Sequence, residues 1–197
     1  MSRLLLRILS KVSRLWFSLR YGAVFRMLGR EAFLHRPFRL DGAEMIELGP
    51  RTVFQRGAWL YCSGVDGVPA SIKIGEGCEF GFNNHISAVR EVQIGRKVLT
   101  ANNVYISDNI HGYEDISRPV MDQSVRFKRA VVIGEGSWIG ENASIIGAHI
   151  GKHCVVGANA VVTQDLPNYS VAVGVPAVVI KQYDPQRREW VMKSRSR

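Results

Sequence analysis

Apolar residues recur at every sixth position along most of the chain, from Leu48 to Val162. Glycine often follows the recurring residue, and a smaller residue stands four places after it. A period of six leaves room for one short strand and one turn, so the pattern predicts a narrow solenoid with three repeats in each coil. We expect the glycines to supply the turn conformations. The recurring residues form five triples: Leu48, Phe54, Leu60; Ile74, Phe80, Ile86; Ile94, Thr100, Ile106; Ile133, Ile139, Ile145; Ile150, Val156, Val162.

The period is suspended once, between Ile106 and Ile133. These two residues are 27 positions apart instead of six, and residues 107–132 between them are polar and charged. The segment contains His111, a residue type that can exchange protons at neutral pH. Loops of this length in a compact domain are usually functional, so we expect a protruding functional loop here.

Two kinds of residue depart from the apolar interior. Asn84 occupies a small inward position, where a buried amide must find hydrogen-bond partners. Cys78 and Cys154 occupy equivalent positions and are expected to act as small hydrophobic residues. The three cysteines, with Cys62, form no CxxC pair, which indicates reduced thiols in a cytoplasmic protein.

Residues 1–45 are expected to form a separate, basic and amphipathic helical segment ahead of the repeats. Residues 1–30 hold seven basic residues and no acid, out of a net charge of +9. Arg3, Arg7, Lys11 and Arg14 follow a 3.6-residue period, which predicts an amphipathic helix that ends near Gly22 or continues, bent, to residue 29. Either this helix packs on its own domain or a neighbouring subunit, or it lies on an anionic membrane surface. Its wide apolar face argues against nucleic acid, and no apolar run is long enough to span a membrane or serve as a signal peptide.

The end of the chain is expected to leave the solenoid. After Pro176 the segment AVVIK is expected to form a departing strand. Residues 184–197 are then expected to form a short helix and a basic tail.

The stretch IGEGSWIGENASIIGAHIGKHCVVGANAVVTQDLP, followed by VAVGVPAVVIK, resembles the hexapeptide-repeat acyltransferases. With ISDNIHGYED, it is similar to sugar O-acetyltransferases of the maltose/galactoside type, above all those acting on O-antigen or exopolysaccharide units. The resemblance implies a mainly β fold, a left-handed parallel β-helix of about five coils over residues 46–183. It also implies a homotrimer that uses acetyl-CoA, with active sites between subunits.

The resemblance also implies roles for individual residues. His111 matches the general base that takes a proton from a sugar hydroxyl, by direct transfer without an acyl-enzyme. Near it, Asp108, Tyr113 and Glu114 are candidates to orient the ring. Acceptor binding is expected of Asn84, whereas strict alignment places the family's asparagine nearer Gly81 or Asn83, and His85 is in reserve. A structural amide at Asn84 is an equal alternative. The family pattern for CoA maps onto Gly140, Ala158, Thr163, Gln164 and Lys181.

We therefore expect an acetyl-CoA-dependent O-acetyltransferase acting on a sugar of a cell-surface glycan or its lipid-linked or nucleotide-linked precursor. The protein is expected in the cytoplasm, with the basic N-terminus as a candidate contact to the inner face of the membrane. The alternatives are N-acyl transfer to an amino sugar and a non-catalytic, membrane-tethered trimeric scaffold. A metal-dependent β-helix enzyme is not expected, because His85 and His111 have no third histidine partner.

Overall fold

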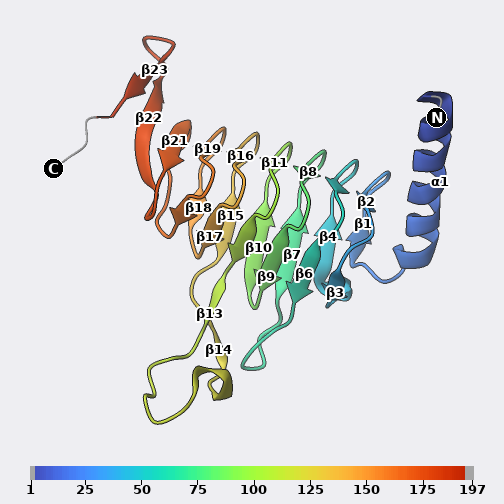
Figure 1. The fold of residues 1–197 in the computed structure, drawn as a ribbon, viewed down its shortest axis with the longest axis horizontal. Helices are drawn as coiled ribbons and strands as arrows, with labels where there is room; N and C mark the ends of the chain where they lie inside the picture. The colour runs from blue at the N-terminus through green and yellow to red at the C-terminus, as the bar shows by residue number, and fades with distance from the viewer. Residues whose placement is uncertain (1–2, 194–197) are drawn as a thin grey trace.

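Short strands from successive coils stack into three faces that run along the molecule (Figure 1). The computed structural model describes the backbone of residues 3–193 and the side chains of residues 12–193. The first face contains β1 (Met27–Leu28), β4 (Ile46–Leu48), β7 (Ser71–Ile74), β10 (Glu91–Ile94), β15 (Val131–Ile133) and β18 (His149–Ile150). The second face contains β2 (Phe33–Leu34), β5 (Val53–Phe54), β8 (Glu79–Phe80), β11 (Leu99–Thr100), β16 (Trp138–Ile139), β19 (Val155–Val156) and β21 (Ser170–Val173). The third face contains β3 (Arg39–Asp41), β6 (Trp59–Cys62), β9 (His85–Ala88), β12 (Tyr105–Ser107), β17 (Ser144–Ile146) and β20 (Val161–Val162).

The strands named above for these three faces pair in parallel, and the chain visits the faces in rotation from β1 to β20. The arrangement fits a left-handed parallel β-helix, as expected. The recurring residues stand in register and are buried; Phe54 and Phe80, for example, stack with ring centroids 3.9 Å apart. The small residues four places later are buried as well. The predicted core is therefore confirmed.

The glycines after the recurring residues serve a different purpose from the one expected. They do not adopt positive φ; a Cβ on Gly75 or Gly95 would lie within 2.7 Å of the backbone of the next coil. Positive φ occurs instead three places after the recurring residue, at Gly57 and Gly77 and at non-glycine residues such as Asn103. The frame glycines are thus required by the close approach of coils, and the turn conformation is carried by the later residue.

The β-helix begins earlier than residue 46, the expected boundary. β1, β2 and β3 lie within residues 27–41 and pair in parallel with β4, β5 and β6. Leu28, Leu34 and Leu40 continue the period of six and align with Leu48, Phe54 and Leu60. This pairing corrects the prediction that residues 22–45 belong to a helical segment. The three leucines form an additional initial coil, which the surrounding arginines obscured in the sequence.

The helix α1 (Arg3–Tyr21) ends beside Gly22, as the first alternative predicted. It stands at the N-terminal end of the β-helix, opposite the C-terminal end (Figure 1). Phe17 is buried against Phe33, with ring centroids 5.5 Å apart, so the helix docks on the first coil. The predicted basic residues Arg3, Arg7 and Lys11 have side chains outside the described part of the chain.

The C-terminal segment forms a hairpin, so the predicted terminal helix is wrong. β22 (Val178–Asp184) leaves as an antiparallel strand beside β21, as expected of AVVIK, and β23 (Glu189–Met192) pairs with it. Asp184 accepts hydrogen bonds from the backbone N–H groups of Gln186 and Arg187, which closes a turn around Pro185. Asp-Pro favours turn initiation, and Tyr183 faces Trp190 across the strands, a pairing typical of a hairpin.

Residues 107–132 protrude from the corner between the third and first faces, as predicted (Figure 1). Two short strands, β13 (Asn109–His111) and β14 (Val125–Phe127), pair antiparallel and form a ribbon. Beyond the ribbon lies a 3-10 turn, η2 (Val120–Asp122); a second such turn, η1 (Ala43–Met45), precedes β4. The loop is therefore an ordered hairpin mounted on the fourth coil.

Candidate active site

His111 is the last residue of β13 and is exposed. It lies opposite Val125 in the ribbon, while Asn109 lies opposite Phe127. Among the described residues, no side chain hydrogen-bonds its imidazole, and two of the expected orienting groups, Asp108 and Glu114, are engaged elsewhere. The ring is thus presented to solvent on a fixed ribbon, where it can exchange a proton with a bound molecule.

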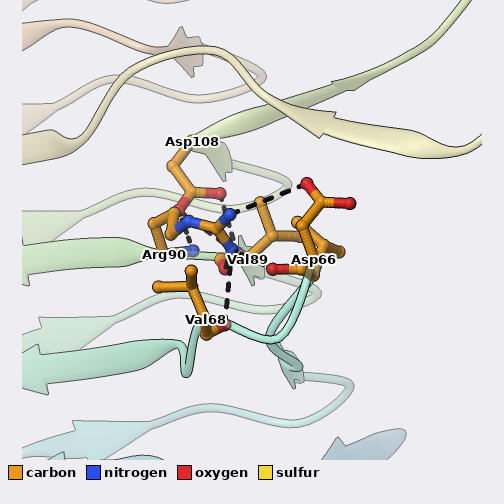
Figure 2. Close-up of polar contacts among 6 residues, drawn as sticks. Asp66, Val68, Val89, Arg90 and Asp108 are labelled. Atoms are coloured by element: carbon orange, nitrogen blue, oxygen red, sulfur yellow. Dashed lines mark hydrogen bonds and ion pairs between the residues drawn. The ribbon is translucent and has the colours of Figure 1, made fainter.

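Asp108 anchors the base of the ribbon rather than orienting His111. The carboxylate is fully buried and accepts backbone hydrogen bonds from Val89 at 2.9 Å and Arg90 at 2.7 Å (Figure 2). It accepts a third from Glu91 at 2.8 Å. The Asn109 side chain donates a further bond to it at 2.9 Å. A carboxylate held by several N–H groups has little capacity left for an imidazole, so its role is to fix the point where the loop leaves the coil.

The interior of the loop depends on residues that the sequence did not single out. Gln123 is buried, and its side-chain amide donates to the carbonyls of Asp115 at 2.9 Å and Arg118 at 3.2 Å. Glu114 forms an ion pair with Arg126 at 2.9 Å, and Tyr113 is exposed. The Tyr113 backbone N–H, helped by Arg126, holds the pKa of Glu114 below its ordinary value. Glu114 is thus ionised and turned towards Arg126.

Asn84 is fully buried and saturated by its own chain. Its amide donates to the carbonyl of Gly81 at 2.8 Å and of Ala101 at 3.0 Å, and its oxygen accepts from the Thr100 hydroxyl at 3.1 Å. The hydrogen-bond partners expected for a buried amide are therefore present. They agree with the alternative that Asn84 is a structural amide. Direct contact between this side chain and an acceptor would require the coil to open.

Asn83 occupies a positive-φ turn position, with φ of 55°. Equivalent turns carry Asn103, Asn142 and Asn159, also with positive φ, and Asn83 donates to the Asn103 side chain at 3.3 Å. Asparagine tolerates this backbone conformation better than most residues do. A ladder of turn residues thus accounts for Asn83 without an acceptor.

His85 faces outward, as the frame predicted, and joins an aromatic ladder on the third face. Its ring stacks on Trp59 with centroids 4.1 Å apart and an interplanar angle of 2°, and Tyr105 lies 5.1 Å away on the other side. Burial lowers the pKa of His85 below its ordinary value. The half-buried ring is thus held between two aromatic neighbours on the third face.

The residues matched to CoA binding lie at three separate places. Gly140 and Ala158 stack at the corner between the second and third faces, where a Cβ on Gly140 would be 2.6 Å from the Ala158 nitrogen. Thr163 and Gln164 follow β20, at the corner between the third and first faces. The long loop leaves the β-helix at the same corner, two coils earlier. Lys181 is exposed on β22. Close coil stacking alone requires glycine at position 140, while Thr163, Gln164 and Lys181 are accessible.

The returning limb of the loop contacts the coil that carries Thr163 and Gln164. Arg129 pairs with Asp165 at 2.6 Å, and the Asp165 carboxylate also accepts from the His149 backbone N–H. The hydrogen bond from Arg129 holds the pKa of Asp165 below its ordinary value. The sequence did not predict this ion pair. It connects the His111 loop to the corner that carries Thr163 and Gln164, two accessible candidates for CoA binding.

The three cysteine thiols are free and buried, as predicted. Burial, reinforced by the Asp108 and Glu44 carboxylates, raises the pKa of Cys62 to about 12. Burial also raises the pKa of Cys78 and of Cys154. A protonated, enclosed thiol is a poor nucleophile. Among the described residues, no group of three His, Cys, Asp or Glu side chains could hold a metal ion.

A groove of about 410 Å³ follows the first face, away from the candidate residues. Lys73, Arg96 and Lys152 line it, together with Glu47 and Glu135. Glu135 pairs with Arg96 at 3.2 Å and with Lys152 at 3.7 Å, so part of the positive charge is neutralised. None of the sequence-predicted site residues lines this groove.

Residues 130–164, the two coils after the loop, match the hexapeptide repeat of succinyl-transferase. This stretch therefore carries the hexapeptide repeat of that family. A probable acetyltransferase of Mycobacterium tuberculosis is 34% identical over 173 residues, which cover 84% of this chain and 57% of the relative. A putative lipopolysaccharide biosynthesis O-acetyl transferase, WbbJ, of Escherichia coli K12 is 40% identical over 113 residues, covering 54% and 58%. This chain thus spans less than two thirds of the length of either relative.

The solved structure of AntD, an N-acyltransferase from Bacillus cereus in complex with dTDP and 3-hydroxybutyryl-CoA, superposes with a TM-score of 0.71. The match covers 86% of this chain and 90% of AntD at 16% identity. At that identity the likeness concerns the fold alone, and it supports the β-helix described above.

Proposed function

We propose that the chain transfers an acetyl group from acetyl-CoA to a sugar hydroxyl of a cell-surface polysaccharide, such as O-antigen or exopolysaccharide, or of its lipid-linked or nucleotide-linked precursor. The observation that carries the proposal is His111, an exposed imidazole on an ordered ribbon at the one long break in a hexapeptide-repeat coil. Both relatives are named acetyltransferases, which supports acetyl as the group transferred. WbbJ is named for lipopolysaccharide biosynthesis, which supports a sugar as the acceptor.

In the proposed reaction His111 acts as the general base. Its neutral imidazole accepts the proton of the sugar hydroxyl while that oxygen forms a bond to the thioester carbonyl carbon. The imidazolium then returns the proton to the sulfur as the carbon–sulfur bond breaks, so the products are the acetyl ester and CoA thiol. No acyl-enzyme is needed because the thioester is already activated, and the buried thiols agree with direct transfer.

We propose a trimer with the site between neighbouring subunits. The His111 imidazole lacks a hydrogen-bond partner among the described residues, so a second copy can supply the facing groups. Leu99 and Trp138 are neighbours in register on the second face and are 46% and 49% exposed. Adjacent exposed apolar side chains are typical of an interface. Sedimentation tests this: a trimer is expected, and Trp138→Glu should weaken it, while a monomeric wild type would contradict it.

CoA is proposed to lie near Thr163, Gln164 and Lys181, with Gly140 and Ala158 offering backbone beside it. The accessible side chains of Thr163 and Gln164 support this placement, as does the contact of Arg129 with Asp165. Lys181→Ala is expected to raise the Kd for CoA by about tenfold if the ammonium meets a phosphate. An unchanged Kd would remove Lys181 from the site.

N-acyl transfer to an amino sugar is the second candidate, because the same fold carries N-acyl transfer in AntD. The two candidates are separated by product analysis after incubation with acetyl-CoA. Matched acceptors that differ only in a hydroxyl or an amino group at one carbon give an alkali-labile ester or an alkali-stable amide. We expect the ester; release of CoA thiol only with amino sugars would establish the second candidate, and no release with any acceptor would contradict both.

We also propose that α1 contacts an anionic membrane surface. Leu15, Trp16 and Leu19 are 61%, 68% and 75% exposed, and basic Arg20 lies beside them. An apolar face flanked by arginine suits the interface of an anionic leaflet. No described helix is long and apolar enough to cross a membrane.

Vesicle sedimentation tests the membrane contact. The wild type is expected to sediment with phosphatidylglycerol vesicles and to remain in solution with phosphatidylcholine alone. Trp16→Glu with Leu19→Glu should abolish binding, whereas Ile116→Glu, at a fully exposed loop position, should not. Equal binding by the α1 variant and the wild type would overturn the contact.

A further inference from the structure

A second, shorter excursion leaves the β-helix at the same corner as the His111 loop. Residues 63–70 connect β6 to β7, two coils before the long loop, and both segments project from the same side of the molecule (Figure 1). Val65 and Val68 form an antiparallel bridge around Asp66 and Gly67, which both have positive φ. This is the two-residue turn preferred in tight hairpins. In the coil between the excursions, only Val89 and Arg90 cross the corner.

The side chain of Arg90 connects the two excursions. Nη1 donates to the carbonyls of Val65 at 2.5 Å and Val68 at 3.3 Å, and Nη2 lies 3.7 Å from Asp66 (Figure 2). On its other side the guanidinium lies over the Phe127 ring, 5.9 Å from the centroid. The side chain is only 20% exposed. A planar guanidinium can hold two carbonyls and stack on a ring at once, which an ammonium cannot do.

The backbone of Arg90 also holds the root of the ribbon. Its N–H donates to Asp108 at 2.7 Å, so one residue fixes both the 63–70 hairpin and the start of the His111 loop. Within the ribbon, Phe127 lies opposite Asn109 and Val125 lies opposite His111. Opposite residues of an antiparallel pair project to the same face, and so do residues two apart. Phe127, and with it Arg90, therefore lies on the His111 face of the ribbon.

We propose that residues 63–70 form a second wall of the acceptor site and that Arg90 is the positioning residue that holds this wall beside the His111 ribbon. The inference rests on the proposed function for its substrate, an acceptor sugar engaged by His111. Arg90 acts through the hairpin and through Phe127. Its loss should therefore weaken acceptor binding while leaving the bond-making step and acetyl-CoA binding intact.

Arg90→Met tests the proposal, because methionine retains an apolar stem over Phe127 and lacks the guanidinium donors. We expect amide exchange of Val68 to rise by at least about tenfold as the hairpin loosens. We expect the acceptor KM to rise by about five- to tenfold, with kcat and the acetyl-CoA KM within about twofold of wild type. Arg90→Lys should recover only part of the wild-type exchange protection and acceptor KM. Asp66→Asn, which removes a long ion pair to an 81% exposed carboxylate, should resemble wild type.

Unchanged exchange in Arg90→Met, or a loss confined to kcat, would overturn the proposal. Should Arg90→Met not fold, Phe127→Leu removes the stacked ring and leaves the Asp108 contacts in place. It should raise the acceptor KM and the exchange of residues 125–127, and wild-type values for both would overturn the proposal. A wild type without acetyl transfer would overturn the proposed function, while hydrogen exchange would still decide whether Arg90 couples the two excursions.

Discussion

The coils and the His111 loop satisfy their polar groups in opposite ways. In the coils, backbone N–H groups donate to carbonyls of the next layer at a repeated offset, as when Gly75 donates to Ile94 and Gly95 to Ile133, both at 2.7 Å. In the loop, polar groups converge on a few side chains, chiefly Asp108 and Gln123. Stability is thus spread over many equivalent contacts in the coils and concentrated in single residues in the loop. A coil tolerates changes that leave its core filled, whereas the loop depends on individual hydrogen bonds.

The largest effect is expected inside a coil. Phe80→Ala removes a fully buried ring that stacks on Phe54, and we expect the free energy of unfolding to fall by about 3–5 kcal/mol. Leu99→Ala, on the outer side of the same face, should cost less than about 1 kcal/mol in the isolated subunit. Denaturant titration measures both. Equal losses would contradict the assignment of inner and outer positions.

A smaller but more local effect is expected at the root of the loop. Asp108→Asn keeps the shape of the side chain but loses the charge that accepts three backbone N–H groups. We expect a loss of about 2–3 kcal/mol, seen as faster amide exchange at Val89, Arg90 and Glu91. Asp122→Asn, at an exposed loop position, is the matched control. Exchange that stays at the wild-type rate in Asp108→Asn would show that the loop is anchored elsewhere.

The smallest effect concerns pH and the aromatic ladder on the third face. Burial lowers the pKa of His85, so the folded protein binds this proton less tightly than the unfolded chain does. Stability should be unaffected above about pH 6.5, the ordinary value, and should decline as the pH falls through it towards the lowered pKa. His85→Phe should remove this decline, and Tyr105→Phe should retain it. Melting temperatures at several pH values measure the difference, and parallel curves for His85→Phe and wild type would contradict it.

Periodicity was enough to predict the solenoid, its inward residues and the position of the long loop, because every coil repeats the same packing problem. The first coil was missed although Leu28, Leu34 and Leu40 keep the period, since basic residues between them resembled an extension of the helix. The terminal hairpin was missed because the turn at Asp184 depends on one capping side chain.

Residues that act through a single contact were out of reach of any periodic argument. Asn84 looked like a departure from the pattern and Asn83 like a match to the family's asparagine, but the structure explains them by internal hydrogen bonds and turn conformation. Arg90, Gln123 and Arg129 carried no signal in the sequence, because their partners lie on other coils or across the loop. These partners are brought close only by the folded corner.

The central claim is that His111 on its ribbon is the general base of acetyl transfer. The most direct measurement is kcat/KM for acetyl transfer by His111→Ala, compared with wild type and with His153→Ala, an exposed histidine near the opposite corner of the first face. We expect His111→Ala to lose about 10²- to 10⁴-fold with CoA binding preserved, and His153→Ala to match wild type. Wild-type kcat/KM in His111→Ala would contradict the claim.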